Sequence, residues 1–157
     1  MAQYDVGQDL DGNGRVIASN EGFKLESTWT FAAATTGAIA AHTLFTVTGN
    51  VLLTVFGVCD TTLTSAGAPT IEVGVTGNTA ALIAQSLGAS LADGEIWVDA
   101  TMTRVGVGAV PAMQALNDGN DIILTVGTAT VTAGVIDFYC LWRPLSSDGN
   151  ITVTTPA

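Results

Sequence analysis

Basic residues are scarce in this sequence. Its 157 residues contain four Lys and Arg against fourteen Asp and Glu, which gives a formal net charge of −10. The four are scattered along the chain, at Arg15, Lys24, Arg104 and Arg143. Proteins that bind phosphate backbones or anionic membrane surfaces use clustered Lys and Arg. We therefore expect neither a nucleic-acid partner nor a membrane partner, whereas a positively charged protein would fit this charge.

Long apolar runs are also missing. The most apolar stretch, residues 51–59, is about half as long as a membrane-spanning helix has to be. Residues 1–12 show neither the basic nor the apolar region of a secretory signal peptide. We expect a protein that is made and used in a cytoplasm-like compartment, or one that is exported only as part of something larger.

Residues that carry out catalysis are few. The single histidine, His42, has no nucleophile motif near it, and we interpret it as a strand-edge residue without a catalytic task. Glu72, Glu95 and Asp99 lie in strand-like segments and could in principle converge as the carboxylates of a glycosidase. Isolated acidic residues on strand faces are usually solvated, and no phosphate-binding glycine loop is present. The sequence therefore favours a protein that is not an enzyme and has no cofactor.

Two cysteines, Cys59 and Cys140, each lie inside an apolar segment. Their spacing does not suit a metal site. Cysteine is among the most buried residue types, so we expect two buried free thiols. A disulfide between paired strands is the alternative.

The stretch at residues 9–20 has the start of a calcium-binding loop. Asp9, Asp11, Asn13 and Gly14 occupy the first, third, fifth and sixth positions, but the twelfth, which needs a bidentate Glu, is Asn20. Asn and Gly both tolerate the backbone of a turn. We therefore favour a chain reversal over a Ca²⁺ site, and assign no metal ligand.

Threonine and glycine are abundant, with 23 and 18 residues, and 48% of the chain is hydrophobic. Threonine and valine suit a pleated strand, and glycine suits its turns. Residues 22–31 alternate, with Phe23, Leu25, Trp29 and Phe31 on one face. The segment at 135–142 alternates in the same way, with one apolar face and with Asp137, Tyr139 and Arg143 on the other face.

The turn residues Thr48, Gly49 and Asn50 lie between two apolar runs, which predicts a tight hairpin. The second run, 51–59, is apolar on both faces and predicts a central strand. Further strands are expected at 70–78, 94–108 and 151–154, and two more within 122–145 around a connection rich in Gly, Thr and Ala. Loops are expected at 32–42 and 61–69, and residues 79–90 fit a short helix or a buried strand equally well.

These patterns predict an all-β fold, an antiparallel β-sandwich, jelly roll or barrel of about eight strands with an extended N-terminal arm. We divide the chain into an arm at 1–21, a β-domain at 22–145 and a tail at 146–157. A mean hydropathy of +0.46 indicates more apolar surface than a monomer of this size buries easily, so we expect an oligomer.

Two stretches resemble small structural proteins of tailed bacteriophages: "FTVTGNVLLTVFGVCDTTLTSAGAPTIEVGVTGN" and "GNDIILTVGTATVTAGVIDFYCLWRPLSSDG". The resemblance covers roughly residues 35–150 and rests on texture rather than on a catalytic motif. It implies a virion component made in the host cytoplasm, most like a head decoration (cement) protein that binds the major capsid protein on the capsid surface as a homotrimer. A tail or fibre module that binds a host glycan or protein is the alternative.

Decoration proteins commonly grip the capsid with terminal arms. In residues 1–21 the apolar side chains that would serve as anchors are Tyr4, Val6, Leu10, Val16 and Ile17. A terminus without a role is the competing interpretation.

Overall fold

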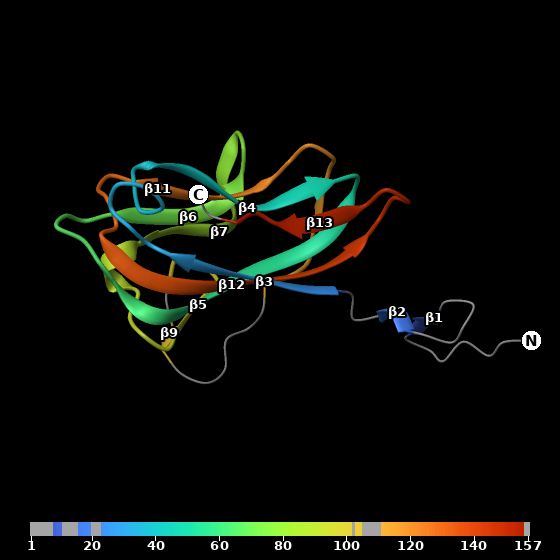
Figure 1. Ribbon diagram of the computed structural model, residues 1–157, viewed down its shortest axis with the longest axis horizontal. Helices are drawn as coiled ribbons and strands as arrows, with labels where there is room; N and C mark the ends of the chain where they lie inside the picture. The colour runs from blue at the N-terminus through green and yellow to red at the C-terminus, as the bar shows by residue number, and fades with distance from the viewer. Residues whose placement is uncertain (1–7, 11–15, 20–22, 102, 105–110, 156–157) are drawn as a thin grey trace, which may run out of the picture.

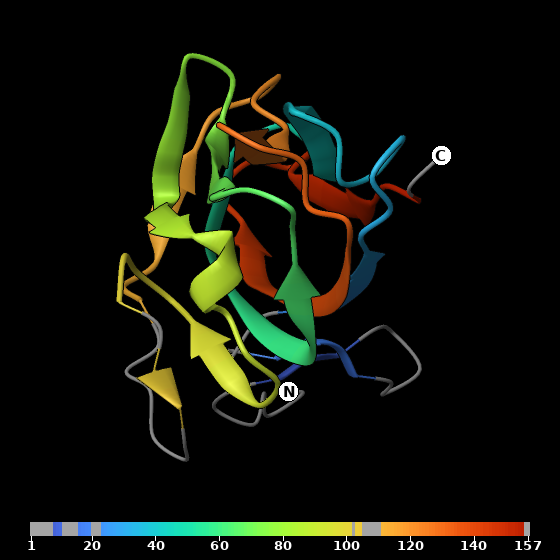
Figure 2. The same ribbon diagram turned by 90° about the vertical axis from the view of Figure 1, so that its left-hand side faces the viewer.

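The structure is a computed structural model that describes residues 8–10, 16–19, 23–101, 103–104 and 111–155. The chain forms two antiparallel sheets packed face to face, a β-sandwich (Figure 1). Figure 2 views the two layers from one end of the molecule. The expected all-β class is confirmed, and the sandwich is the architecture that forms.

The lower layer in Figure 1, sheet I, has six strands. Its order is β3 (Phe23–Thr30), β12 (Ala133–Pro144), β5 (Val51–Thr64), β8 (Glu95–Trp97) and β9 (Thr103–Arg104), and β10 (Gln114–Leu116) also pairs with β5.

The upper layer, sheet II, has five strands. Its order is β13 (Asn150–Val153), β4 (Ala40–Thr48), β11 (Ile122–Gly127), β6 (Thr70–Val75) and β7 (Asn78–Leu87). A short 3₁₀ turn, Gly88–Ser90, follows β7. Strands β1 (Gln8–Leu10) and β2 (Val16–Ser19) form a separate two-stranded sheet.

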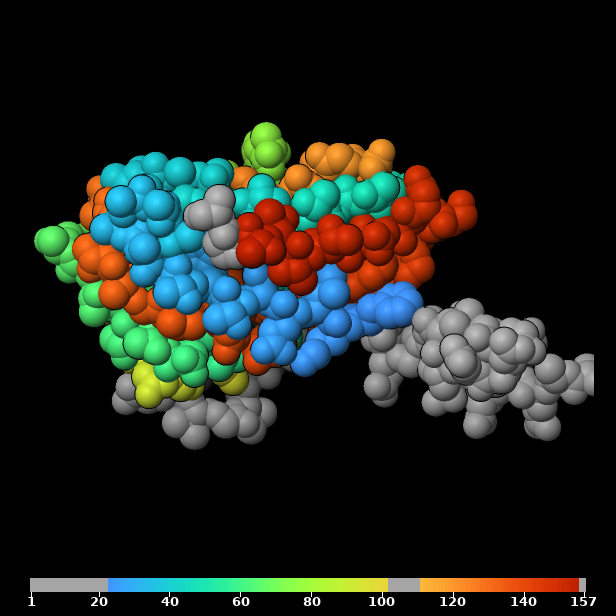
Figure 3. Space-filling model, in the orientation of Figure 1, coloured from blue at the N-terminus to red at the C-terminus, as the bar shows by residue number. Residues whose placement is uncertain are grey.

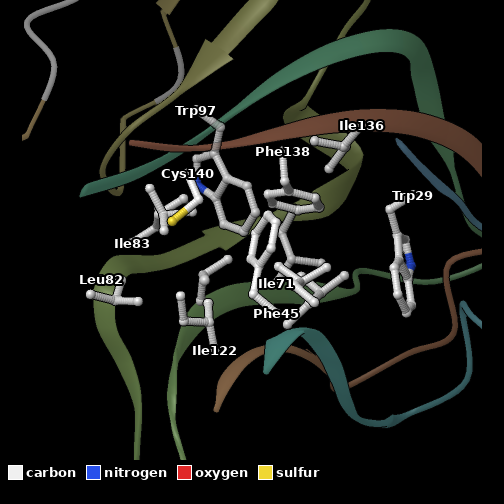
Figure 4. Close-up of a cluster of buried hydrophobic side chains, with 14 of the residues drawn as sticks. Trp29, Phe45, Ile71, Leu82, Ile83, Trp97, Ile122, Ile136, Phe138 and Cys140 are labelled. Carbon is white, nitrogen blue, oxygen red and sulfur yellow. The ribbon is translucent and has the colours of Figure 1, made fainter. Parts of the chain in front are cut away.

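The core lies between the two sheets. Phe138 and Trp97 from sheet I meet edge to face, with ring centroids 6.2 Å apart. Phe45 and Ile83 reach them from sheet II, as Figure 4 shows. Trp29 lies at the far side of this cluster, and its indole Nε1 donates to the Thr36 carbonyl oxygen at 3.1 Å.

The alternating patterns of the sequence correspond to β3, the edge strand of sheet I, and to β12, its neighbour. In β3 the expected face points to the core, with Trp29 buried, and in β12 Ile136, Phe138, Cys140 and Trp142 are all buried. β5 is a central strand, as expected, because β12 pairs with one of its edges and β8 and β10 with the other. The edge strand expected near 151–154 is β13, which borders β3 in Figure 3.

The prediction of a hairpin at residues 48–50 is wrong. β4 and β5 flank this turn but belong to different sheets, so the turn carries the chain from sheet II to sheet I. Turn residues fix a change of direction but not the partners of the flanking strands. Those partners, β11 and β13 for β4 and β12 for β5, lie far along the chain.

This crossing, the 48–50 corner, is held by two other loops. The backbone N–H of Asn50 donates to Ser146 Oγ at 2.8 Å, and its carbonyl accepts from the N–H of Leu145 at 2.8 Å. The N–H of Gly49 donates to Asp118 Oδ1 at 2.8 Å. The corner therefore depends on residues about 70 and 95 positions later.

The same four residues, Val-Thr-Gly-Asn, recur at 75–78 and there do form a hairpin. Val75 pairs with Asn78, and Gly77 has a φ of 87°. Gly49 has a φ of 63°. One tetrapeptide therefore makes both a hairpin and a sheet-to-sheet corner.

Two strand lengths also differ from expectation. The prediction of one long strand over 94–108 is wrong, because the chain bends after Trp97, and the described residues of this stretch form two short strands, β8 and β9. β5 continues to Thr64, into the loop expected at 61–69. Residues 79–90, which fitted helix or strand, are mostly β7.

The two glycines give a matched test of the corner. We expect Gly49→Ala to reduce the free energy of unfolding much more than Gly77→Ala. Both substitutions place a side chain at positive φ, which costs roughly 1–2 kcal/mol. At Gly49 the new Cβ would also lie 2.8 Å from the backbone carbon of Asp148, whereas at Gly77 nothing lies within 4 Å.

Urea denaturation of the two variants measures this difference, which we expect to exceed about 1 kcal/mol because backbone, unlike a flexible side chain, cannot move aside cheaply. Equal losses in the two variants would contradict the role given to the corner.

Candidate interaction surface

The outer face of sheet I, the side away from sheet II, carries a cluster of apolar side chains. Its central strand β5 points Leu53 and Val55 into the core and Phe56 and Val58 outward. Neighbouring strands add to the same face, and we call the resulting patch the outer band: Leu52, Phe56, Val58, Ile96, Tyr139 and Leu141. All six are half-buried in the single chain.

An aromatic pair lies at the centre of the outer band. Phe56 and Tyr139 are paired across β5 and β12, and their rings stack with centroids 5.3 Å apart. The Lys24 ammonium lies 5.4 Å from the centroid of the Tyr139 ring and 3.2 Å from the Glu26 carboxylate. Desolvation raises the pKa of the Tyr139 phenol, and the nearby carboxylates raise it further. The Tyr139 phenol therefore stays protonated at neutral pH, beside the Glu26 carboxylate with which it is level.

Charge is distributed unevenly along this face. Lys24 and Arg143 lie towards one end of the strands, level with or beyond Leu141. Asp137 lies towards the other end, where it accepts a hydrogen bond from Thr28 Oγ1 at 2.6 Å, and Asp60 follows on β5. Basic residues thus lie towards one end of the outer band and Asp137 and Asp60 towards the other, while Glu26 is level with its centre.

The outer face of sheet II differs in character. It carries Thr46 and Thr152, which are paired across β4 and β13, together with Thr125 and Glu72 on β11 and β6. Glu72 accepts a hydrogen bond from the Gln85 amide at 3.0 Å. Short hydroxyl side chains lie together here, although two strands of this sheet, β7 and β13, also carry the exposed apolar residues Leu87 and Val153.

Sequence reasoning assigned Tyr139, Asp137 and Arg143 to the non-core face of their strand, and this is correct. It missed the outer band, because the doubly apolar run at 51–59 was interpreted only as a buried central strand. The overlooked signal was that Phe56 and Val58 alternate with residues that already fill the core.

The arm residues fall partly within the described chain. Leu10 lies in β1, and Val16 and Ile17 lie in β2; Leu10 pairs with Val16 beside a bulge. Tyr4 and Val6 lie outside the described residues, as do Asp11 and Asn13 of the candidate calcium loop. Asp9 is a β1 residue that pairs with Ala18, and the chain reverses between the two strands.

His42 lies at one end of the sandwich. Its ring is 5.5 Å from that of Trp29, and its Nε2 lies 3.0 Å from the Ala38 carbonyl oxygen. An open cavity of about 370 Å³ lies here, lined by Trp29, Thr35, Thr36, His42, Thr43, Thr154 and Thr155. No cysteine, serine or carboxylate is among the described lining residues, so His42 has no nucleophile or acid beside it there.

The three candidate carboxylates belong to different parts of the fold. Glu72 lies on β6 in sheet II, whereas Glu95 lies on β8 in sheet I and accepts from the Ala92 N–H at 2.8 Å. Asp99 follows β8 and accepts from the Thr101 N–H at 2.6 Å.

A second cavity, of about 450 Å³, is lined by Thr70, Gln85, Ser86, Leu87, Ser90, Ala100 and Thr101. None of the three carboxylates is among these residues. The cavity presents hydroxyl and amide groups, which suit a neutral polar ligand.

Within the described residues, no three His, Cys, Asp or Glu side chains are grouped so that they could hold a metal ion. Over the same part of the chain, no helix is long and apolar enough to cross a membrane.

Both cysteines are free and buried, as expected. They lie on adjacent strands but out of register, since Cys59 pairs with Ile136 and Cys140 with Val55. Cys140 is therefore level with a residue four positions from Cys59 on β5, which places the two cysteines roughly 13 Å apart along the strands. This distance is well beyond the Cα separation that a disulfide can span. The disulfide alternative is therefore excluded.

Comparisons with models of protein families, with curated proteins and with solved structures find no match to this chain. The properties of the outer band, the arm and the cavities therefore have to be argued from this chain's own residues.

We expect neither thiol to react with Ellman's reagent in the native protein at pH 8. Desolvation raises the pKa of Cys59 to about 11 and that of Cys140 to about 12, so both thiols stay protonated as well as buried. In denaturant both should react. A thiol that reacts rapidly in the folded protein would contradict this burial.

The two cysteines should also tolerate serine differently. The Cys59 Sγ donates to the Thr61 carbonyl oxygen at 3.3 Å, and a serine hydroxyl would find the same acceptor. Within the described chain no acceptor is recorded for Cys140, which is fully buried. We expect Cys140→Ser to cost about 1–3 kcal/mol of stability and Cys59→Ser less than about 1 kcal/mol, measured by urea denaturation. The reverse order would contradict the surroundings described for these thiols.

Proposed function

We propose that this chain is a non-enzymatic structural protein of a tailed-bacteriophage virion. In this proposal it binds the major capsid protein on the outside of the head as a decoration (cement) protein, and it acts as an oligomer, a homotrimer by the resemblance noted above. Its task is to cover and tie together neighbouring capsid subunits. That task needs complementary surface rather than a reactive group.

The outer band is the observation that carries the proposal. A stacked aromatic pair and four aliphatic side chains, all half-buried in the single chain, lie together on the outer face of this sheet, and an apolar cluster of this kind often marks a contact surface. Here that arrangement is built into β5, the central strand of sheet I. A protein whose function is to associate with other protein surfaces accounts for this arrangement.

The N-terminal segment supports the same function. β1 and β2 pair with each other and with neither sheet of the sandwich. A two-stranded hairpin is marginal on its own in water, so a surface that binds it would stabilise it. Leu10, Val16 and Ile17, together with Tyr4 and Val6, are the apolar side chains available for such contact.

The second candidate function is a tail or fibre module that binds a host glycan. It is favoured by the cavity at Thr70, Gln85, Ser86 and Thr101, whose hydroxyl and amide groups suit sugar hydroxyls. Glycan-array binding that is lost in Gln85→Ala would support this function over the first.

We expect the purified protein to co-sediment with heads assembled without it from the major capsid protein of the same phage. Replacing Tyr4, Val6, Leu10, Val16 and Ile17 together by serine should weaken this binding by at least about tenfold, because the apolar contacts of the arm are removed. Circular dichroism should show an unchanged sandwich, since these residues precede β3.

A matched control replaces Gln3, Gln8 and Asn20, polar residues of the same segment, by serine and should bind like the unaltered protein. Failure of the unaltered protein to co-sediment would refute the capsid function. Equal binding by both variants would refute the role of the arm.

A further inference from the structure

Strand β3 forms one edge of sheet I, at one side of the sandwich (Figure 2). Among the described strands it pairs with β12 alone, in one unbroken register over all eight of its residues. The other edges are less regular: β7 pairs with β6 through two register shifts, and β13 and β9 have only four and two residues. Bulged and short edges resist pairing with another chain, so β3 is the edge best suited to it.

The backbone of β3 shows which of its residues face the open side. The N–H of Phe31, directly after β3, donates to the Gly134 carbonyl oxygen beside β12 at 2.9 Å. Successive residues of a strand direct their N–H and C=O groups to opposite sides. Lys24, Glu26 and Thr28 therefore direct these groups away from β12, towards the open side of the strand.

The loop after β3 closes the far end of this edge. Thr30 also directs its carbonyl to the open side, and there the carbonyl accepts a hydrogen bond from Thr36 Oγ1 at 2.7 Å. The same hydroxyl oxygen accepts from the Ala32 N–H at 2.9 Å. The loop thus occupies the position that a further strand would take beside Thr30, and the open stretch of the edge runs from Phe23 to Thr28.

The core-facing side chains of β3 change along the same stretch. Ser27 and Trp29 are 3% and 2% exposed, whereas Phe23 and Leu25 are only half-buried. Phe23 packs against the Trp142 ring, with centroids 4.9 Å apart. Apolar side chains are therefore incompletely covered where the backbone edge is open, and a strand added here would cover them further.

The charges on this edge select one partner and one register. Lys24 and Glu26 are exposed on the outer face, on either side of Leu25. A second copy of β3 laid antiparallel, with the two-fold axis at Leu25, sets Lys24 of each copy opposite Glu26 of the other. An axis at Lys24 or at Glu26 would set like charges opposite each other. An axis at Ser27 would bring Lys24 against the closed end at Thr30.

We propose that β3 is a self-association edge, through which two copies of this chain join their sheets I into one continuous antiparallel sheet. Each Lys24–Glu26 pair across the junction also exchanges two backbone hydrogen bonds, because both residues direct their backbone groups to the open side. A lone lysine would repel its own copy and protect the edge. Glu26, two residues later, turns this repulsion into attraction, and so the strand is complementary to itself.

The contact is small, which sets its strength. It uses about five residues of each strand, well below a standard interface of about 800 Å² per partner. Part of the charge attraction already exists within each copy, since Lys24 Nζ lies 3.2 Å from the Glu26 carboxylate. We therefore expect a reversible dimer with a dissociation constant on the order of 100 µM.

This contact is separate from the proposed capsid binding. An isologous contact generates pairs, whereas a three-fold ring needs two different patches on each copy. A trimer on a capsid would therefore use another surface, and the dimer can be measured without any capsid.

Sedimentation equilibrium over a concentration series that extends well above the expected dissociation constant measures the association. The unaltered protein should dimerise. Lys24→Glu and Glu26→Lys should each raise the dissociation constant at least about tenfold, because each sets like charges opposite each other. The exchanged variant Lys24→Glu/Glu26→Lys should dimerise like the unaltered protein, since opposite charges face each other again.

A new cysteine reports the register. In the proposed dimer the two Leu25 residues are opposite each other at a non-hydrogen-bonded position, with Cα atoms about 4.5 Å apart, which a disulfide can span. Leu25→Cys should therefore give a covalent dimer under mild oxidation. Thr28→Cys, exposed on the same strand but roughly 20 Å from its counterpart, should not. The native cysteines are buried and should not interfere.

Glu72→Lys is the control for charge reversal elsewhere, because Glu72 lies on the outer face of sheet II, and it should dimerise like the unaltered protein. Circular dichroism should show all variants folded. An unaltered protein that remains monomeric throughout the series overturns the proposal. So does an exchanged variant that stays monomeric, a pair of single reversals that both dimerise unchanged, or a covalent dimer of Thr28→Cys in place of Leu25→Cys.

Discussion

Strand β5 has to place apolar side chains on both of its faces, and much of the structure follows from this requirement. Its inner face packs Leu53, Val55 and Cys59 against sheet II. Both edges of this strand are paired, one with β12 and the other with β8 and β10. Its outer face carries Phe56 and Val58, which remain half-buried.

The 48–50 corner delivers the chain to this central position. Asn50 and Gly49 bond to loops that come much later in sequence, so the crossing between sheets is fixed only when those loops are in place. The second Val-Thr-Gly-Asn, at 75–78, closes an ordinary hairpin. Local turn chemistry is the same at both sites, and the long-range partners decide what it builds.

Features of the fold that depend on local sequence could be predicted, and features that depend on long-range partners could not. Period-two alternation identified β3 and β12 and their core faces, because burial on one face of a strand leaves a direct trace in the sequence. Sheet membership leaves no such trace, and so the hairpin at 48–50 was predicted wrongly. The 94–108 stretch kept a strand-like pattern although the chain bends after Trp97. Tertiary contacts there outweigh local preference.

The candidate surface was predictable only in part. The outward direction of Tyr139 and Arg143 could be derived from alternation, but the position of Lys24 opposite Leu141 required the β3–β12 register. The stacking of Phe56 on Tyr139 similarly required the register of β5 with β12. Register joins residues more than 80 positions apart, and a single sequence does not reveal it.

The place of β12 between β3 and β5 also affects how the protein is made. Both of its neighbours lie before residue 65, while β12 begins at Ala133. During synthesis β3 and β5 therefore leave the ribosome without the strand that joins them, and sheet I can close only when nearly the whole chain has been released. Until then the two apolar faces of β5 are uncovered, so a nascent chain truncated before Ala133 should be prone to aggregation.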